Sequence, residues 1–219
     1  MTSMATTRQA SSSPPVALGG LAALSAIAMG VLMIALAHHR AAHFNTDLLL
    51  SIHAHYAASA GRAAILASKV FAPAVMAIVS LLIALAAWLG RARIEAMAIA
   101  VVDILAAGTT EGLKHAVREA RPHLFPWPVH ASGFSFPSGH TMMATALLPL
   151  LALLFARTTR SSLVRGLVWA VAILGPLAIG FDRLYLGVHW PTDVLGGFLG
   201  GLVFACGGLM VMLPVQRRG

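Results

Sequence analysis

The sequence predicts an all-α protein, an integral membrane bundle of six transmembrane helices, on two observations. Of the 219 residues, 58% are hydrophobic and only 10% are charged, whereas soluble domains are about half apolar and a quarter charged. The apolar residues also form six runs of helix length with few charges inside them, and about 20 such residues cross a hydrocarbon core of about 30 Å. These runs use up the chain, so we expect one membrane domain and no second folded unit.

The first run, 16–37, is uncharged and is interpreted as a retained span. A secretory signal peptide is the alternative, because Ala35 and Ala37 form a small-x-small cleavage pattern. The apolar region of a signal peptide, however, covers only about 7–15 residues. The further spans are predicted at 64–90, 94–113, 139–156, 166–181 and 191–214.

The arginine residues predict the orientation of these spans. They recur in alternate connections, as Arg8, Arg91, Arg93, Arg157, Arg160, Arg165, Arg217 and Arg218. Cytoplasmic loops carry an excess of Lys and Arg. We therefore predict a multi-pass protein of the cell inner (plasma) membrane, with a disordered cytoplasmic tail at 1–15, the membrane domain at 16–214 and a cytoplasmic C-terminal tail at 215–219.

The formal net charge of +8 raises the possibility of a nucleic-acid partner. The basic residues, however, lie in small groups between apolar runs and form no stripe, so we expect no nucleic-acid binding. Loop charge that orients the chain and attracts anionic head groups explains them better. Cys206 is the single cysteine, so no intramolecular disulfide can form.

Two ionisable residues fall inside predicted spans, Lys69 near the outer end of the second and Asp103 near the middle of the third. An unpaired charge there costs several kcal/mol. We expect Lys69 to pair with Glu111, and Asp103 to be protonated or hydrogen-bonded inside the bundle. A transporter, in which both residues mark a polar path, is the alternative from a different class.

Polar clusters stand where the third and fifth spans end and the fourth and sixth begin, so they share one side of the membrane. They comprise Lys114, Arg121 and Pro122, then Pro137, Ser138, Gly139 and His140, then Arg183, His189 and Asp193. A phosphate group needs cations for its oxygens, a nucleophile in line with the bond to be broken, and an acid for the leaving group. Lysine, arginine and the backbone N–H groups at the start of a helix bind such an anion.

The histidines supply the remaining two roles. Asp193 lies four residues after His189, and if Pro191 begins the sixth helix its carboxylate can turn back to the imidazole. Such a carboxylate fixes the tautomer and stabilises the charged ring, which makes the free ring nitrogen a directed nucleophile. His140 is then left as the general acid.

Together, Lys114-x6-Arg121-Pro122, Pro137-Ser138-Gly139-His140 and Arg183-x5-His189-x3-Asp193 resemble the three signature motifs of the type 2 phosphatidic acid phosphatase superfamily, in the family's order. The resemblance runs from about residue 111 to 201. From Asp182 to Gly201 the sequence is similar to bacterial membrane members.

The resemblance implies a helical bundle in which His189 attacks phosphorus to give a phosphohistidine, His140 protonates the leaving group and Asp193 supports His189. It also implies phosphate binding by Lys114, Arg121, Ser138, Gly139 and Arg183, with no metal and no cofactor. One position departs from the family pattern, because Asp182 stands where serine is often found. An acid there either holds Arg183 by a salt bridge or weakens its hold on the anion.

The expected partners are membrane lipids and a lipid phosphate or diphosphate substrate at the extracytoplasmic face. Undecaprenyl diphosphate ranks first, with phosphatidylglycerol phosphate, phosphatidate and the phosphates of lipid A as alternatives. The oligomeric state stays open.

Other polar residues receive no catalytic role. His115, Arg118, His123 and His130 are expected to be solvated loop residues. A His-rich outer stretch at 38–55 has loose spacing for a metal site, and the aromatic residues at 125–136 suit either a membrane-surface belt or simple anchoring of the loop.

Overall fold

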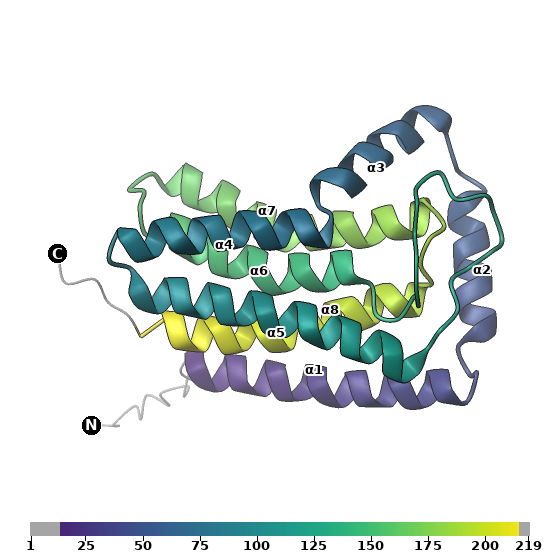
Figure 1. Cartoon of the computed structure of the whole chain (residues 1–219), viewed down its shortest axis with the longest axis horizontal. Coiled ribbons are helices and arrows are strands. Elements are labelled where there is room, and N and C mark those ends of the chain that lie inside the picture. Colours follow the sequence, from purple (N-terminus) through teal and green to yellow (C-terminus); the bar gives the residue numbers. More distant parts are fainter. Residues whose placement is uncertain (1–13, 215–219) are drawn as a thin grey trace, which may run out of the picture.

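The structure, a computed structural model, describes residues 14–214. This part of the chain is all-helical, as predicted, and contains no strand (Figure 1). Its helices are α1 (Pro14–Ala37), α2 (Ala42–His53), α3 (Ala58–Val70), α4 (Pro73–Leu89), α5 (Arg93–Val117), α6 (Gly139–Ala156), α7 (Ser162–Tyr185) and α8 (Pro191–Met212). Of the tails expected at 1–15 and 215–219, residues 1–13 and 215–219 lie outside the described residues. Pro14 and Pro15, which were expected in the N-terminal tail, instead belong to α1.

The long helices lie side by side, with α6 in the middle of the bundle (Figure 1). α6 packs against α4, α5, α7 and α8, and most of its side chains are buried. The outer helices α1, α4 and α7 instead present large apolar side chains on their outer faces. This distribution suits a bundle whose solvent is lipid, because lipid tails accept apolar side chains as readily as a protein core does.

The described residues contain five helices long and apolar enough to cross a membrane, α1, α5, α6, α7 and α8. The α3–α4 pair supplies the sixth span and is bent by 47°, so the second span is not the continuous helix predicted at 64–90. The chain breaks where Pro73, which has no N–H to donate, begins α4. α7 is longer than the span predicted at 166–181 and contains Pro176.

One helix, α2, was not predicted. It crosses the end of the bundle at which α1 finishes (Figure 1), and its buried Asn45 joins it to α8. The Asn45 Nδ2–H donates to Thr192 Oγ1 at 2.9 Å, and Asn45 Oδ1 accepts from the Thr192 backbone N–H at 3.1 Å. α2 therefore anchors the first turn of α8. Although α2 carries two residues of the His-rich stretch, residues 14–214 contain no cluster of three His, Cys, Asp or Glu that could hold a metal.

Of the two ionisable residues expected inside the spans, Asp103 behaves as predicted, whereas the pairing predicted for Lys69 is wrong. Asp103 is buried and accepts a hydrogen bond from Ser80 Oγ across α4 and α5, which fits a structural role. Glu111, however, pairs with Lys114 on its own helix, with Nζ and Oε1 2.7 Å apart, and not with Lys69. The bend between α3 and α4 carries Lys69 into the wall of a cavity instead.

Small residues set the distance between α6 and α8. A Cβ added at Gly197 would lie 2.8 Å from both the Ser138 carbonyl oxygen and the Thr141 Cβ, whereas one added at Gly207 would meet nothing within 4 Å.

We predict that Gly197→Ala destabilises the protein by about 1–3 kcal/mol, because overpacking forces backbone shifts. Gly207→Ala is the matched control and should leave the stability unchanged or raise it by up to about 1 kcal/mol, because alanine is the better helix former. Thermal unfolding in detergent measures both, and equal effects would contradict the close packing.

The orientation gives a second prediction. Ser161 lies at the start of α7, at the end of the bundle where α1 begins, and His130 lies in the loop at the opposite end. Cysteine placed at each position in a Cys206→Ser background should be labelled in intact cells by an impermeant thiol reagent at 130 and not at 161, because arginine-rich loops stay inside. Labelling at 161 alone would put the site described next in the cytoplasm.

Candidate active site

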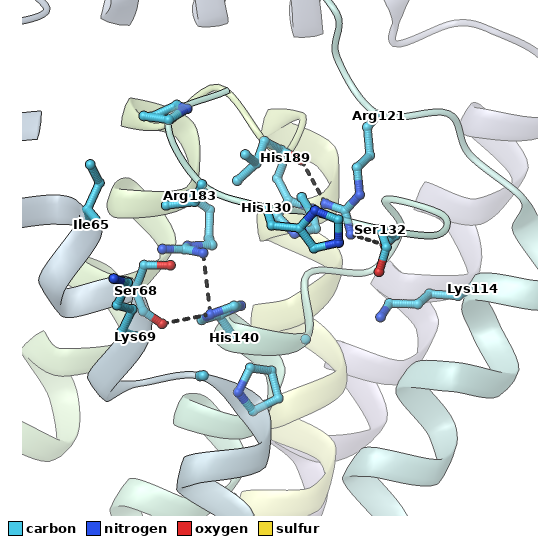
Figure 2. A pocket seen from close by; sticks show the side chains of 17 residues that line it. Ile65, Ser68, Lys69, Lys114, Arg121, His130, Ser132, His140, Arg183 and His189 are labelled. Atoms are coloured by element: carbon cyan, nitrogen blue, oxygen red, sulfur yellow. Dashed lines mark hydrogen bonds between the residues drawn. The ribbon is translucent and has the colours of Figure 1, made fainter. Parts of the chain in front are cut away.

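The polar clusters meet around a cavity of about 610 Å³ at the end of the bundle where α5 and α7 finish and α6 and α8 begin (Figure 2). Its charged and imidazole side chains are Lys69, Lys114, Arg121, His130, His140, Arg183 and His189. No carboxylate from the described residues lines it. A hollow with cations and no acid in its wall attracts anions.

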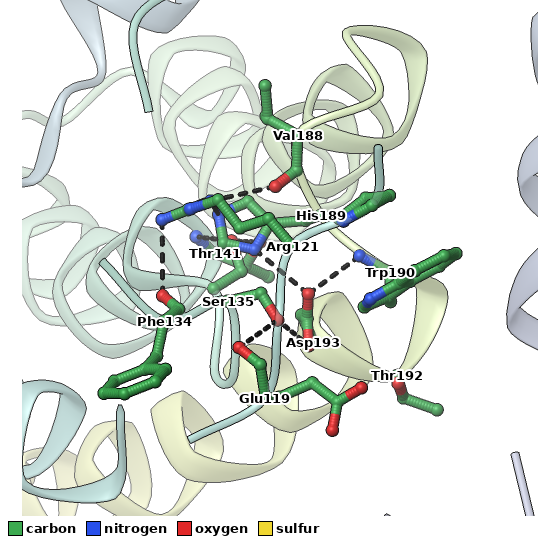
Figure 3. Close-up of polar contacts among 12 residues, drawn as sticks. Glu119, Arg121, Phe134, Ser135, Thr141, Val188, His189, Trp190, Thr192 and Asp193 are labelled. Atoms are coloured by element: carbon green, nitrogen blue, oxygen red, sulfur yellow. Dashed lines mark hydrogen bonds and ion pairs between the residues drawn. The ribbon is translucent and has the colours of Figure 1, made fainter. Parts of the chain in front are cut away.

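His189 and Asp193 form the pair expected from their spacing. α8 begins at Pro191 and Asp193 is its third residue, so its Oδ2 accepts the backbone N–H of Trp190 at 2.7 Å (Figure 3). The same oxygen lies 3.2 Å from His189 Nδ1. Asp193 is 0% exposed and His189 is 4% exposed. If Nδ1 carries the proton and donates it to Asp193, the lone pair of Nε2 is available to the cavity that His189 lines.

Burial lowers the pKa of His189 well below its usual value, and the charges of Arg121, Arg183 and Lys114 lower it further. The imidazole is therefore neutral at neutral pH, which is the form that can act as a nucleophile. The nearby Asp193 carboxylate can stabilise the positive charge that the ring gains once Nε2 forms a bond.

Asp193 also connects the other clusters to this pair. Its Oδ1 accepts from Ser135 Oγ at 3.3 Å, and its backbone carbonyl accepts the N–H of Ser138 at 2.9 Å. Ser135 in turn donates its backbone N–H to the Glu119 carbonyl at 2.9 Å. Its Oγ lies 3.2 Å from the same carbonyl oxygen (Figure 3). The loop after α5 and the start of α6 are thereby fixed against the first turn of α8.

Arg121 organises the loop that covers the cavity. Its guanidinium donates to the carbonyls of Gly133 at 3.1 Å, Ser132 at 3.0 Å, Phe134 at 3.3 Å and Val188 at 2.8 Å. Nη1 also lies 3.2 Å from His189 Nε2 (Figure 3). Arginine has five N–H groups, so every one of them has a partner here. The Nη1–H that faces His189 Nε2 is the group that can change its acceptor and donate a hydrogen bond to an anion bound beside His189.

His140 stands against the broken end of α3. Its Nε2 lies 3.2 Å from the Ser68 carbonyl oxygen, which the end of the helix leaves without an intrahelical donor. Nε2 also lies 3.3 Å from Arg183 Nη1 (Figure 2). The carbonyl can only accept and the guanidinium can only donate, so the position of the proton on His140 decides which hydrogen bond forms.

Asp182 holds Arg183 by a salt bridge, the first of the two alternatives for this unusual residue. Asp182 Oδ2 accepts from Arg183 Nε at 3.0 Å and from Nη2 in a close contact, and both residues are buried. This pairing occupies the Nε and Nη2 edge of the guanidinium, so that Nη1 points toward His140. Asp182 Oδ1 is buried and has no hydrogen-bond partner among residues 14–214.

Six of the eight predicted site residues line the cavity: Lys114, Arg121, Gly139, His140, Arg183 and His189. Asp193 and Ser138 stand behind the wall, and both are 0% exposed. Ser138 Oγ caps α6 by accepting from Thr141 N at 3.5 Å and from Thr141 Oγ1 at 3.0 Å. Phosphate binding by Ser138 therefore stays a prediction.

Sequence reasoning missed four contributors, Ser68, Lys69, His130 and Ser135. Ser68 contacts His140 through its backbone carbonyl, which no side-chain pattern reveals. Ser135 acts through its side chain, but serine is so common in loops that its presence there gives no signal. His130 is an exposed loop residue, as expected, and it also lines the cavity. His115, Arg118 and His123 do not line it; His115 contacts Phe134 and His123 stacks on Trp127.

The fold is similar to that of a solved protein. The crystal structure of a transmembrane PAP2-type phosphatidylglycerolphosphate phosphatase from Bacillus subtilis superimposes with a TM-score of 0.80, covering 94% of this chain and 99% of that one at 23% identity. Because the two sequences are only 23% identical, this similarity is evidence for a shared fold alone.

Sequence similarity is concentrated in part of the chain. It is 42% identical over 92 residues to phosphatidylglycerophosphatase B of Bacillus subtilis, covering 42% of this chain and 45% of the relative. It is 26% identical over 116 residues to undecaprenyl-diphosphatase of Sulfolobus acidocaldarius, covering 51% and 52%. It is 32% identical over 120 residues to lipid A 1-phosphatase of Rhizobium etli, covering 47% of each. The matches span about half the length of these relatives.

The PAP2 superfamily model matches residues 95–217, which is more than half of the 219 residues and contains all three motifs. The three motifs converge on the cavity, to which they contribute His140, His189 and the cations Lys114, Arg121 and Arg183. The chain therefore belongs to the PAP2 superfamily, as the motifs predicted.

Proposed function

We propose that this membrane protein is a lipid phosphatase that hydrolyses a phosphate or diphosphate ester of a lipid through a phosphohistidine on His189. The observation that carries the proposal is the placement of a buried, carboxylate-backed imidazole and a second histidine on one cavity that is lined by cations. His189 and His140 both border this cavity, and Asp193 lies 3.2 Å from His189 Nδ1.

In the first half of the reaction, His189 Nε2 attacks phosphorus and the bond between phosphorus and the leaving oxygen breaks. The proton that the leaving oxygen needs comes from His140. Asp193 stabilises the positive ring that carries the phosphoryl group. The products of this half are the free lipid leaving group and phosphohistidine.

In the second half, a water molecule takes the place of the leaving group. His140, which has lost its proton, accepts one from the water as the water oxygen attacks phosphorus. The bond between phosphorus and Nε2 breaks, and inorganic phosphate leaves. Both histidines return to their starting protonation states, so the cycle balances.

The cations stabilise the charge of the transferred phosphoryl group. Arg121 and Arg183 present planar guanidinium groups, which suit phosphate oxygens, and Lys114 adds a point charge. Gly139 is the first residue of α6 and lines the cavity, so its backbone N–H can donate a hydrogen bond to the same anion. These groups supply the positive charge that a metal ion supplies in other phosphatases, so we expect no metal or cofactor requirement.

The substrate class follows from the relatives and the site together. Relatives named phosphatidylglycerophosphatase, undecaprenyl-diphosphatase and lipid A 1-phosphatase all act on a phosphate group of a membrane lipid. We propose undecaprenyl diphosphate at the outer face of the inner membrane as the first substrate, with phosphatidylglycerol phosphate, phosphatidate and lipid A as alternatives. Phosphate release from a panel of these lipids in detergent, compared as kcat/KM, tests this order, and a large preference for a glycerolipid would overturn it.

The roles of the two histidines give a direct test. His189→Ala should abolish phosphoenzyme formation and turnover, because it removes the nucleophile. His140→Ala should slow turnover by about 10²- to 10⁴-fold, the usual effect of losing a general acid. Rapid quench with labelled substrate, followed by a test for acid-labile, base-stable phosphate, measures the intermediate.

His123→Ala is the matched control, because His123 lies at the same end of the bundle but stacks on Trp127 outside the cavity. It should retain both the intermediate and turnover. Appreciable turnover by His189→Ala, or label that is retained on His140, would show that the roles are wrongly assigned.

The lowered pKa of His189 predicts the acid limb of the pH profile. The neutral ring is the active form, so kcat/KM should stay high as the pH falls through about 6.5, the usual histidine value, and decline only below it. Lys114→Gln should move this limb to higher pH, because Lys114 is one of the charges that lower the pKa. A wild-type limb centred at or above about 6.5 would contradict the burial argument.

A further inference from the structure

Lys69 is a cation of the cavity wall that belongs to none of the three motifs. It lies in the last turn of α3, is exposed and lines the cavity. Within the described part of the chain, its ammonium makes no hydrogen bond and no ion pair within 4.0 Å.

The other cations of the cavity already have partners. Arg183 is paired with Asp182, Lys114 lies 2.7 Å from Glu111, and Arg121 donates to backbone carbonyls. Since no carboxylate from the described residues lines the cavity, Lys69 adds positive charge that nothing in its wall offsets. A singly phosphorylated lipid already has Arg121, Arg183 and Lys114 for its oxygens, so this extra charge fits a second anionic group.

The position of Lys69 indicates which group that is. The preceding residue, Ser68, has its carbonyl oxygen 3.2 Å from His140 Nε2, so Lys69 is next to the residue that contacts the general acid. In Figure 2, Lys69 and Ser68 lie on one side of His140, and Lys114 lies on the other. A leaving oxygen that receives its proton from His140 lies close to the end of α3, because His140 contacts Ser68 there, and Lys69 is the cation at that end of α3.

The chemistry of that atom differs between lipid substrates. In a phosphate monoester it is carbon, and the leaving group is an alkoxide whose main need is a proton. In a diphosphate it is the second phosphorus, and the leaving group is a lipid monophosphate that takes the bridging oxygen and its bonding electrons. Negative charge then accumulates on this phosphate as the bond breaks, and a neighbouring ammonium stabilises it.

We propose that Lys69 forms a subsite for the leaving phosphate of a lipid diphosphate. His189 takes the terminal phosphoryl group, His140 supplies the proton to the bridging oxygen, and Lys69 binds the phosphate that stays on the lipid. This subsite rests on the proposed function, and it selects diphosphates over monoesters by recognising the group that departs.

The test compares two substrates in one enzyme. Lys69→Gln should lower the ratio of kcat/KM for a polyprenyl diphosphate to kcat/KM for phosphatidate by about ten-fold, the scale of one charge-assisted contact. Lys69→Arg should keep most of the ratio, because it keeps the charge. Arg62→Gln is the matched control: Arg62 is an exposed cation of the same helix that does not line the cavity, and its removal should leave the ratio unchanged.

Product inhibition provides a second readout that needs only one working substrate. The lipid monophosphate released from the diphosphate should inhibit Lys69→Gln about ten-fold more weakly than wild type. Inhibition by inorganic phosphate should be the same in both, because inorganic phosphate binds beside His189. Thermal unfolding in detergent checks that the variant is folded.

The outcomes separate the two proposals. If wild type releases phosphate from no lipid, the proposed function fails. If wild type is active but the substrate ratio and the inhibition by lipid monophosphate are unchanged in Lys69→Gln, the function stands and the subsite is wrong. An equal loss on both substrates also overturns the subsite, because it would make Lys69 part of general phosphate binding.

Discussion

The carboxylate of Asp193 is fully buried, and the active-site region is arranged around its hydrogen bonds. Oδ2 accepts the Trp190 N–H and faces His189 Nδ1, while Oδ1 accepts from Ser135 Oγ. A buried carboxylate is costly unless such partners satisfy it, so any movement of the α7–α8 loop or of the loop after α5 leaves an acceptor without a donor. The backbone carbonyl of the same residue holds Ser138 at the start of α6. Two segments that are far apart in the sequence, 135–138 and 189–193, therefore share one anchor.

The break between α3 and α4 is the second constraint on the site. A continuous helix would use the Ser68 carbonyl in its own hydrogen-bond ladder, whereas the break at Phe71 and Ala72 releases it to His140. Free backbone groups at membrane depth are tolerated where they are buried in protein or line a polar cavity, and this carbonyl borders one. The bend also moves the last turn of α3 from the side of the bundle to the wall of the cavity. The interrupted second span thus contributes to the site without carrying any of the three motifs.

The sequence was sufficient for the parts of the molecule that depend on hydropathy and on side-chain chemistry. Spans are set by the length of apolar runs, and α6 occupies the range 139–156 that was predicted for it. The pairing of His189 with Asp193 also followed from spacing, because Pro191 marks the helix start. The position of Lys69 on the cavity could not be obtained in this way, since counting depth along the spans assumed a straight helix where the chain bends. Asn45 and Ser135 act through tertiary hydrogen bonds of one isolated residue each, which leave no periodic pattern in the sequence.

The two proposals assign chemistry and substrate choice to different parts of this fold. In the proposed mechanism, the motif residues at 114–193 perform steps that every phosphate ester requires. Relatives named for three different lipid substrates match this chain over about half their length. The residues that could distinguish those lipids must then lie on cavity walls beyond the motifs. α3 is such a wall, and it precedes the family match, which begins at residue 95. A helix bent away from the bundle can vary in sequence without disturbing the anchor at Asp193, because its contact with the catalytic residues is the backbone carbonyl of Ser68. A side chain beside that carbonyl can therefore select the leaving group while the machinery that transfers the phosphoryl group stays the same.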